Sequence, residues 1–237
     1  LYVMGGYYRP LFGNFNVDHT VLPQRMISYT LQDNFRSYDL NYQAFTLGGS
    51  PNVPYANLHL VQRQFGPSKN ETNNGFAANV GGRFVTLGFS VAYSYWRTEK
   101  EKLQADEKVT ERVEMHHAGI GAQVGPVTVN LDLYSMTKDT PNDAFREGGV
   151  YGVETYTRVW RENYLQLAYY SANVAETLDP GAGQQARLGL RSFLYPGVDL
   201  YMGFRLLESQ KVFNPADNSQ QSETNIGGYL GQIHLYM

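Results

Sequence analysis

Histidine is the side chain most often used to move protons or to bind metal ions near neutral pH, and this sequence contains five. His116 and His117 are neighbours, and neighbouring residues of a strand point to opposite faces, so the pair cannot bind one metal ion. We interpret both as structural residues where a strand meets a loop. His59 and His234 each stand alone on one face of a strand, which favours hydrogen bonding over metal binding. The sequence therefore predicts no metal site.

Other catalytic patterns are absent from the sequence. It has no GxSxG turn, no HExxH zinc motif and no glycine-rich phosphate loop. It has no cysteine, which excludes thiolate nucleophiles and thiolate metal sites. A hydrolase needs a serine and a histidine on one face, oriented by a third polar group, and Ser192 has no histidine on its face in a recognisable motif. We therefore predict that the chain is not an enzyme and has no cofactor.

Charged residues that alternate onto one face of the predicted strands are the remaining candidates for a functional site. Arg187, Arg191, Asp199 and Arg205 come from adjacent segments and are expected to form a basic wall. If this wall faces acidic residues across a narrow pore, the field between them orients polar solutes and sets ion preference. The alternative is a network of ion pairs that only fills a narrow interior. The predicted pore-lining residues are Arg63, Asp132, Glu154, Arg158, Arg187, Arg191, Asp199 and Arg205.

Strands must position these side chains, and the segment 84–98 shows the clearest strand pattern. Every second residue from Val85 to Tyr95 is bulky and apolar or aromatic, whereas the residues between them are small and weakly polar. A period of two residues indicates a β-strand. The segment 198–209 repeats the alternation, so we predict an all-β chain.

The composition limits which kind of β-protein this is. Charged residues are 17% of the chain, whereas soluble domains average about 25%, and the chain is rich in tyrosine (19) and glycine (24) instead. An α-helical membrane protein would show runs of about 20 apolar residues, and none is present. The net charge of −3 and the lack of a basic run give no support for nucleic-acid binding.

The length of the strands and of their connections favours a membrane barrel. Segments such as 84–98 exceed the usual strand of about 5–6 residues in globular sheets and suffice for the 9–11 or so residues of a tilted membrane strand. Tight turns such as the one at 195–197 alternate with longer polar connections such as 99–110 and 210–221. Outer-membrane barrels show this alternation, with short periplasmic turns and longer extracellular loops.

The last segment, from Ile226 to Met237, resembles the closing strand of the outer-membrane porin superfamily. In that superfamily the closing strand usually ends on an aromatic residue that the barrel assembly machinery reads. Here the last aromatic residue is Tyr236, followed by Met237. The resemblance implies an architecture and no particular family within it.

We therefore predict a transmembrane antiparallel β-barrel of about 12 strands, with 14 as the alternative. Residues 1–24 are expected to be a lead-in, a plug or an extra strand, and residues 25–237 the barrel. The chain begins at Leu1, and we read it as a mature or trimmed form. The predicted strands are 25–32, 36–46, 55–65, 74–82, 84–98, 111–124, 126–138, 149–159, 163–174, 185–194, 198–209 and 223–236.

Three functions follow from these patterns. The first is a porin-like channel in the bacterial outer membrane for passive diffusion of small hydrophilic solutes or ions, because the inward residues of 84–98 are small and leave room for water. The second is an occluded barrel that anchors or scaffolds another envelope protein. The third is an outer-membrane enzyme, which would show a Ser–His or carboxylate pair aligned on one face. The expected partners are membrane lipid, small polar solutes or ions, and an envelope protein.

Overall fold

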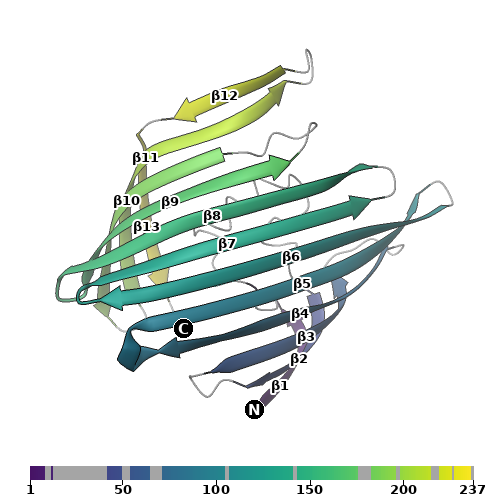
Figure 1. The fold of residues 1–237 in the computed structure, drawn as a ribbon, viewed down its shortest axis with the longest axis horizontal. Helices are drawn as coiled ribbons and strands as arrows, with labels where there is room; N and C mark the ends of the chain where they lie inside the picture. Colours follow the sequence, from purple (N-terminus) through teal and green to yellow (C-terminus); the bar gives the residue numbers. More distant parts are fainter. Residues whose placement is uncertain are drawn as a thin grey trace.

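The chain folds into one strongly curved antiparallel sheet of 13 strands (Figure 1). The computed structural model describes residues 1–8, 12, 42–49, 54–64, 71–104, 107–140, 143–175, 183–195, 198–214, 219–225 and 227–235. The strands are β1 (Tyr2–Tyr8), β2 (Tyr42–Gly49), β3 (Tyr55–Gln64), β4 (Glu71–Phe84), β5 (Phe89–Gln104), β6 (Glu107–Val124), β7 (Val127–Thr140), β8 (Asp143–Trp160), β9 (Asn163–Ala175), β10 (Gly183–Tyr195), β11 (Val198–Asn214), β12 (Ser219–Asn225) and β13 (Tyr229–Leu235).

Each strand from β1 to β12 pairs with the next along the chain, and β13 pairs with β11. Strands β12 and β13 bind successive parts of β11, since Asn225 lies opposite Glu208 and Tyr229 opposite Phe204. The two therefore form one interrupted strand, broken at Gly227, where φ is 83°. The continuous strand predicted over 223–236 is wrong at this break.

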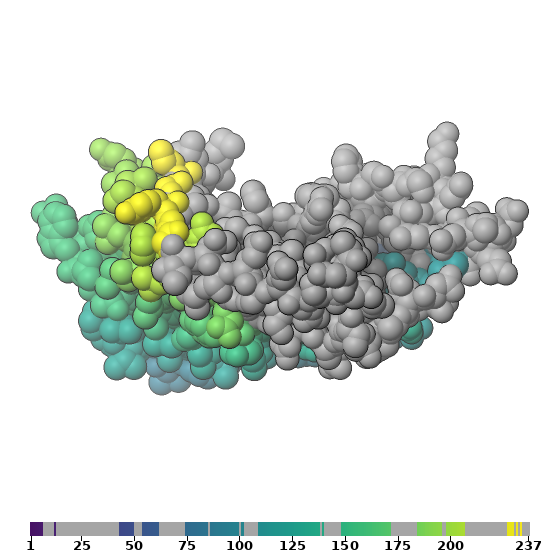
Figure 2. Space-filling view, turned by 90° about the horizontal axis from the view of Figure 1, so that it is seen from above, coloured from purple at the N-terminus to yellow at the C-terminus, as the bar shows by residue number. Residues whose placement is uncertain are grey.

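The sheet thus has twelve columns, 13 strands less one, and the predicted all-β barrel architecture of about 12 strands is confirmed. Strand β1 and the column formed by β12 and β13 are its edges, and no pairing joins them within the described part of the chain. The predicted strand 25–32 lies outside the described residues. Seen from above, the wall curves upward from the teal strands toward the yellow C-terminal segment (Figure 2).

Two connections differ from the prediction. Val85–Leu87 form a 3-10 turn, so the strand predicted over 84–98 begins only at Phe89. Gly88 causes this, because its φ of 61° turns the chain and its carbonyl accepts a hydrogen bond from the amide of Gln123 at 2.6 Å. The segment 99–110, predicted as a loop, is mostly strand, because β5 and β6 remain paired out to Gln104 and Glu107.

The outer face of the sheet is apolar. Leu131 and Leu133 on β7 and Leu165 and Leu167 on β9 are each 42 to 59% exposed, whereas the residues between them on β7 are buried. An exposed apolar band of this kind is stable in contact with lipid chains. The predicted lipid-facing surface is therefore present. In the part of the chain that the structure describes, no helix is long and apolar enough to cross a membrane.

Candidate functional site

A row of buried polar side chains crosses the inner face of strands β4 to β7. The strand register places Asn79 opposite Ser94, Ser94 opposite His117, and His117 opposite Tyr134. All four side chains are buried. Directly opposed residues on one face of an antiparallel pair have Cβ atoms about 4.5–5.5 Å apart, so the row brings a hydroxyl beside an imidazole.

His117 forms an ion-pair-type hydrogen bond with Asp132 on the next strand. The distance from His117 Nε2 to Asp132 Oδ1 is 2.8 Å, and both side chains are fully buried. Asp132 lies between Gly119 on one side and Gly152 on the other, and the ring of Tyr170 packs over Gly152. The second ring nitrogen, Nδ1, has no hydrogen-bond partner among the residues that the structure describes.

Ser94 is held by a chain of amide side chains. Asn79 Nδ2 donates to Ser94 Oγ at 2.8 Å, and Asn57 Nδ2 donates to Asn79 Oδ1 at 3.5 Å. The serine oxygen therefore accepts from Asn79, and the opposed His117 has one ring nitrogen, Nδ1, that forms no hydrogen bond with Ser94 or any other described residue. Ser94, His117 and Asp132 have the composition and order of a nucleophile, a general base and a base-orienting acid.

This arrangement overturns the reason for predicting that the chain is not an enzyme. That prediction rested on the lack of a Ser–His pair aligned on one face, and it considered Ser192 on the outer face. The pair Ser94 and His117 lies on the inner face instead, with Asp132 as the third group. The prediction is therefore wrong in its premise, and the predicted position of His117 where a strand meets a loop is wrong as well, because His117 lies in the middle of β6.

An apolar patch lies on the inner wall next to this row. Trp96, Met115 and Met136 are opposed across β5 to β7 and are almost completely buried. The ring of Phe12 joins them, with its centroid 6.3 Å from those of Trp96 and Tyr134. Small side chains facing a water-filled lumen were the basis for predicting a passive channel. That prediction is wrong, because the inner wall is an apolar core here and Phe12 is buried against it.

The charged residues predicted for the lumen separate into distinct groups. Asp132, Glu154, Arg187 and Asp199 are buried. Arg191 donates to Asp199 Oδ2 from both Nε, at 3.1 Å, and Nη2, at 2.6 Å. Both donors reach the same carboxylate oxygen, and this charge-assisted pair neutralises the buried carboxylate.

Glu154 has its own partner within the buried group, and the remaining members of the set lie elsewhere. Glu154 Oε2 accepts a hydrogen bond from the Tyr156 hydroxyl at 2.8 Å. Arg158 is exposed near the end of β8, where it pairs with Glu162 of the following turn at 2.9 Å. Arg205 lies opposite Arg187 on β11. Arg63 is part of β3, and its side chain lies outside the described residues.

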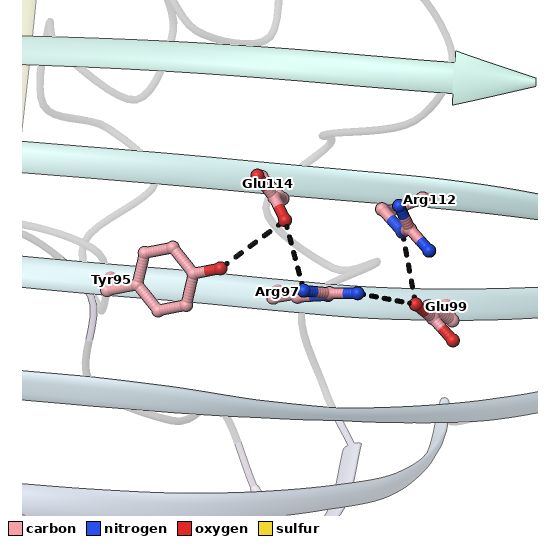
Figure 3. Close-up of polar contacts among 5 residues, drawn as sticks. All are labelled: Tyr95, Arg97, Glu99, Arg112 and Glu114. Carbon is pink, nitrogen blue, oxygen red and sulfur yellow. Dashed lines mark hydrogen bonds and ion pairs between the residues drawn. The ribbon is translucent and has the colours of Figure 1, made fainter.

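Beyond the apolar band, the hairpin of β5 and β6 carries a ladder of charges on its outer face (Figure 3). Arg97 lies opposite Glu114, and Glu99 lies opposite Arg112. Arg97 pairs with Glu99 at 2.9 Å and with Glu114 at 3.5 Å, and Arg112 pairs with Glu99 at 3.0 Å. Hydrogen bonds from Arg97 and then Arg112 lower the pKa of Glu99 below its usual 4.5. These cross-strand pairs explain why the charged segment continues as strand.

Comparison with known proteins gives a match in structure only. Neither the protein-family models nor the curated proteins gave a match. Among solved structures, a loop L8 deletion mutant of OmpT, an outer membrane protein of Vibrio cholerae, is similar with a TM-score of 0.62 and 12% identity over 98% of this chain and 70% of that chain. In-vitro folded OmpT in its trimer form is similar with a TM-score of 0.59 and 12% identity, over 98% and 71% of the two chains.

The fold is that of an outer-membrane β-barrel protein. This agrees with the predicted location in the bacterial outer membrane and with the exposed apolar band. The descriptions of these structures name an outer membrane protein and no channel, so they give the channel prediction no support either. The function of this chain must therefore be argued from its own inner wall.

Proposed function

We propose that this outer-membrane barrel is a hydrolase of esters or amides, with Ser94 as nucleophile, His117 as general base and Asp132 as the residue that orients His117. The observation that carries the proposal is the buried hydrogen bond of 2.8 Å from His117 to Asp132, with Ser94 opposite His117 in the strand register. Asn79 is a positioning residue, because it donates to Ser94 Oγ.

The reaction needs only these groups and water. Ser94 Oγ attacks the carbonyl carbon of the substrate and passes its proton to Nδ1 of His117, while Asp132 stabilises the imidazolium. The tetrahedral intermediate then expels the leaving group, which takes the proton from His117 and leaves an acyl group on Ser94. A water molecule gives a proton to His117 and attacks the acyl group, which releases the acid and restores Ser94.

The two sides of the row differ in the space beside them, and a substrate would have to enter from the open side. Phe12 packs beside His117, with 6.4 Å between ring centroids, and blocks the side of the apolar patch. The opposite side adjoins a cavity of about 230 Å³, which Ala92 and Gly119 line. These two residues are opposed and lie two positions from Ser94 and His117 on the same face. The cavity therefore ends next to Ser94 and His117 on this face, although neither of them lines it.

An active-site probe tests the proposal. A fluorophosphonate, which forms a covalent bond with activated serines, is applied to the folded protein in detergent micelles, and the labelled peptide is located by mass spectrometry. We expect labelling at Ser94 that Ser94→Ala abolishes. The matched control is Ser135→Ala, because Ser135 is exposed on the outer face of β7.

Since Phe12 lies beside His117, the same assay is run on Phe12→Ala, which should label faster. The proposal is overturned if Ser94 is labelled neither in the folded unmodified chain nor in folded Phe12→Ala. It is also overturned if Ser94→Ala is labelled as strongly as the unmodified chain.

A further inference from the structure

The cavity beside the Ser94 row has polar walls at its other end. It has a volume of about 230 Å³ and lies against the inner face of β3 to β7. Tyr55, Arg83, Ser90 and Asn130 contribute polar groups to its lining. Arg83 and Ser90 are opposed across β4 and β5, so the guanidinium and a hydroxyl approach the same space.

Two glycines leave room for the polar side chains that line this cavity. A Cβ atom on Gly81 would meet the Tyr55 hydroxyl at 2.5 Å, and one on Gly121 would meet the Ser90 hydroxyl and, at 2.8 Å, Asn130 Oδ1. The polar ends of three side chains from different strands therefore lie over glycines. Any larger residue at positions 81 or 121 would displace them.

Arg83 brings a positive charge to this cavity. Arg83 is exposed, and no carboxylate pairs with it among the side chains that the structure describes. Tyr55 lies within the electrostatic influence of Arg83. An arginine without a partner, beside hydroxyl groups that can donate hydrogen bonds, has the groups that recognise an oxyanion, because charge-assisted hydrogen bonds to carboxylate or phosphate are the strong ones.

We propose that this cavity is a binding site for a small oxyanion, a carboxylate or a phosphate group, which Arg83 neutralises and the hydroxyls of Tyr55 and Ser90 orient. The inference goes beyond the proposed hydrolysis and does not depend on Ser94. If both hold, the anion is the part of the substrate that anchors it beside the serine.

Calorimetric titration of the folded protein in a non-ionic detergent tests the site, with inorganic phosphate in one arm and acetate in the other. We expect binding of at least one anion, and a loss of about tenfold or more in affinity for Arg83→Gln, equal to about 1.4 kcal/mol. Arg112→Gln is the matched control, because Arg112 is exposed on the outer face of the hairpin. The arm that binds more tightly identifies phosphate or carboxylate as the preferred group.

A second variant keeps the positive charge of Arg83 and fills part of the cavity. Gly121→Val places a side chain where the polar ends of Ser90 and Asn130 meet, so it should abolish anion binding although Arg83 is intact. Ser94→Ala should bind the anion as the unmodified chain does. Circular dichroism confirms that each variant is folded. The absence of binding at millimolar phosphate and acetate, or equal binding by Arg83→Gln, would overturn the site. Neither result bears on labelling of Ser94.

Discussion

His117 and Asp132 are joined on the inner wall by a hydrogen bond of 2.8 Å, and neither side chain is exposed. The bond fixes which ring nitrogen of His117 is held by the acid, and it leaves Nδ1 as the nitrogen that can act as a base. A fixed tautomer is what a general base requires. The pair is therefore the point at which the proposed mechanism can be tested most directly.

Asp132→Asn should leave the fold intact and slow the labelling of Ser94 by about three to four orders of magnitude, because an amide at this position holds the wrong tautomer of the histidine. The rate of fluorophosphonate labelling measures the effect. Asp139→Asn is the control, since Asp139 is exposed on the same strand. Equal rates for the two variants would show that Asp132 has no role in activating the serine.

The ion pair of Arg191 with Asp199 should contribute to stability. Asp199 is fully buried and Arg191 holds it with two hydrogen bonds, so Arg191→Leu should lower the free energy of unfolding by about 3–5 kcal/mol through the buried charge that remains. Urea unfolding from lipid vesicles measures it. The double variant Arg191→Leu, Asp199→Leu should recover much of the loss. Arg161→Leu, at an exposed turn position, should have little effect.

Phe12 should protect Trp96 from water. Trp96 is 1% exposed and packs against Phe12, whereas the second tryptophan, Trp160, is 65% exposed. In a Trp160→Phe background, Phe12→Ala should shift the fluorescence of Trp96 to longer wavelength and destabilise the chain by about 3–5 kcal/mol. Phe84→Ala, at an exposed ring, is the control. An unchanged emission maximum would mean that Phe12 does not cover the tryptophan.

Acid should weaken the ladder of charges on β5 and β6 and thereby loosen the end of this hairpin. The pKa of Glu99 is lowered in the folded chain, so its contribution to stability is complete above the ordinary pKa of 4.5 and is lost as the pH falls through the lower, folded value. Protection from hydrogen exchange at the end of the hairpin, measured relative to the intrinsic rate at each pH, should therefore fall as the pH drops below the ordinary pKa of 4.5. Glu99→Gln should exchange faster at pH 7 and lose most of this pH dependence; equal pH dependence in both proteins would contradict the role of Glu99.

The alternation of residue types was sufficient to predict most of the strands and the faces of their central residues. It placed Ser94 and Asp132 on the inner side, because the period of two residues is set within each strand. The partners across strands are set by the register, which depends on the turns. The tight turn at 125–126 fixes which residues of β6 and β7 are opposed. This register is what brings His117 close to Asp132.

The position of Ser94 opposite His117 could not be predicted from the sequence for a different reason. It depends on the hairpin of β5 and β6, and a run of mixed charges such as 99–110 is usually a solvated loop. Opposite charges lie directly across from each other in this hairpin, which extends the pairing to Gln104 and Glu107. Only the paired structure shows that the charges are complementary, and thus that the serine meets the histidine.

The direction of the two edge strands limits how the wall can be completed. β1 runs antiparallel to the interrupted column of β12 and β13, since eleven antiparallel steps separate them. An edge left unpaired in lipid is costly. A single inserted strand would have to run parallel to one of its neighbours, so the gap can be bridged only by direct contact of the two edges or by strands added in whole hairpins.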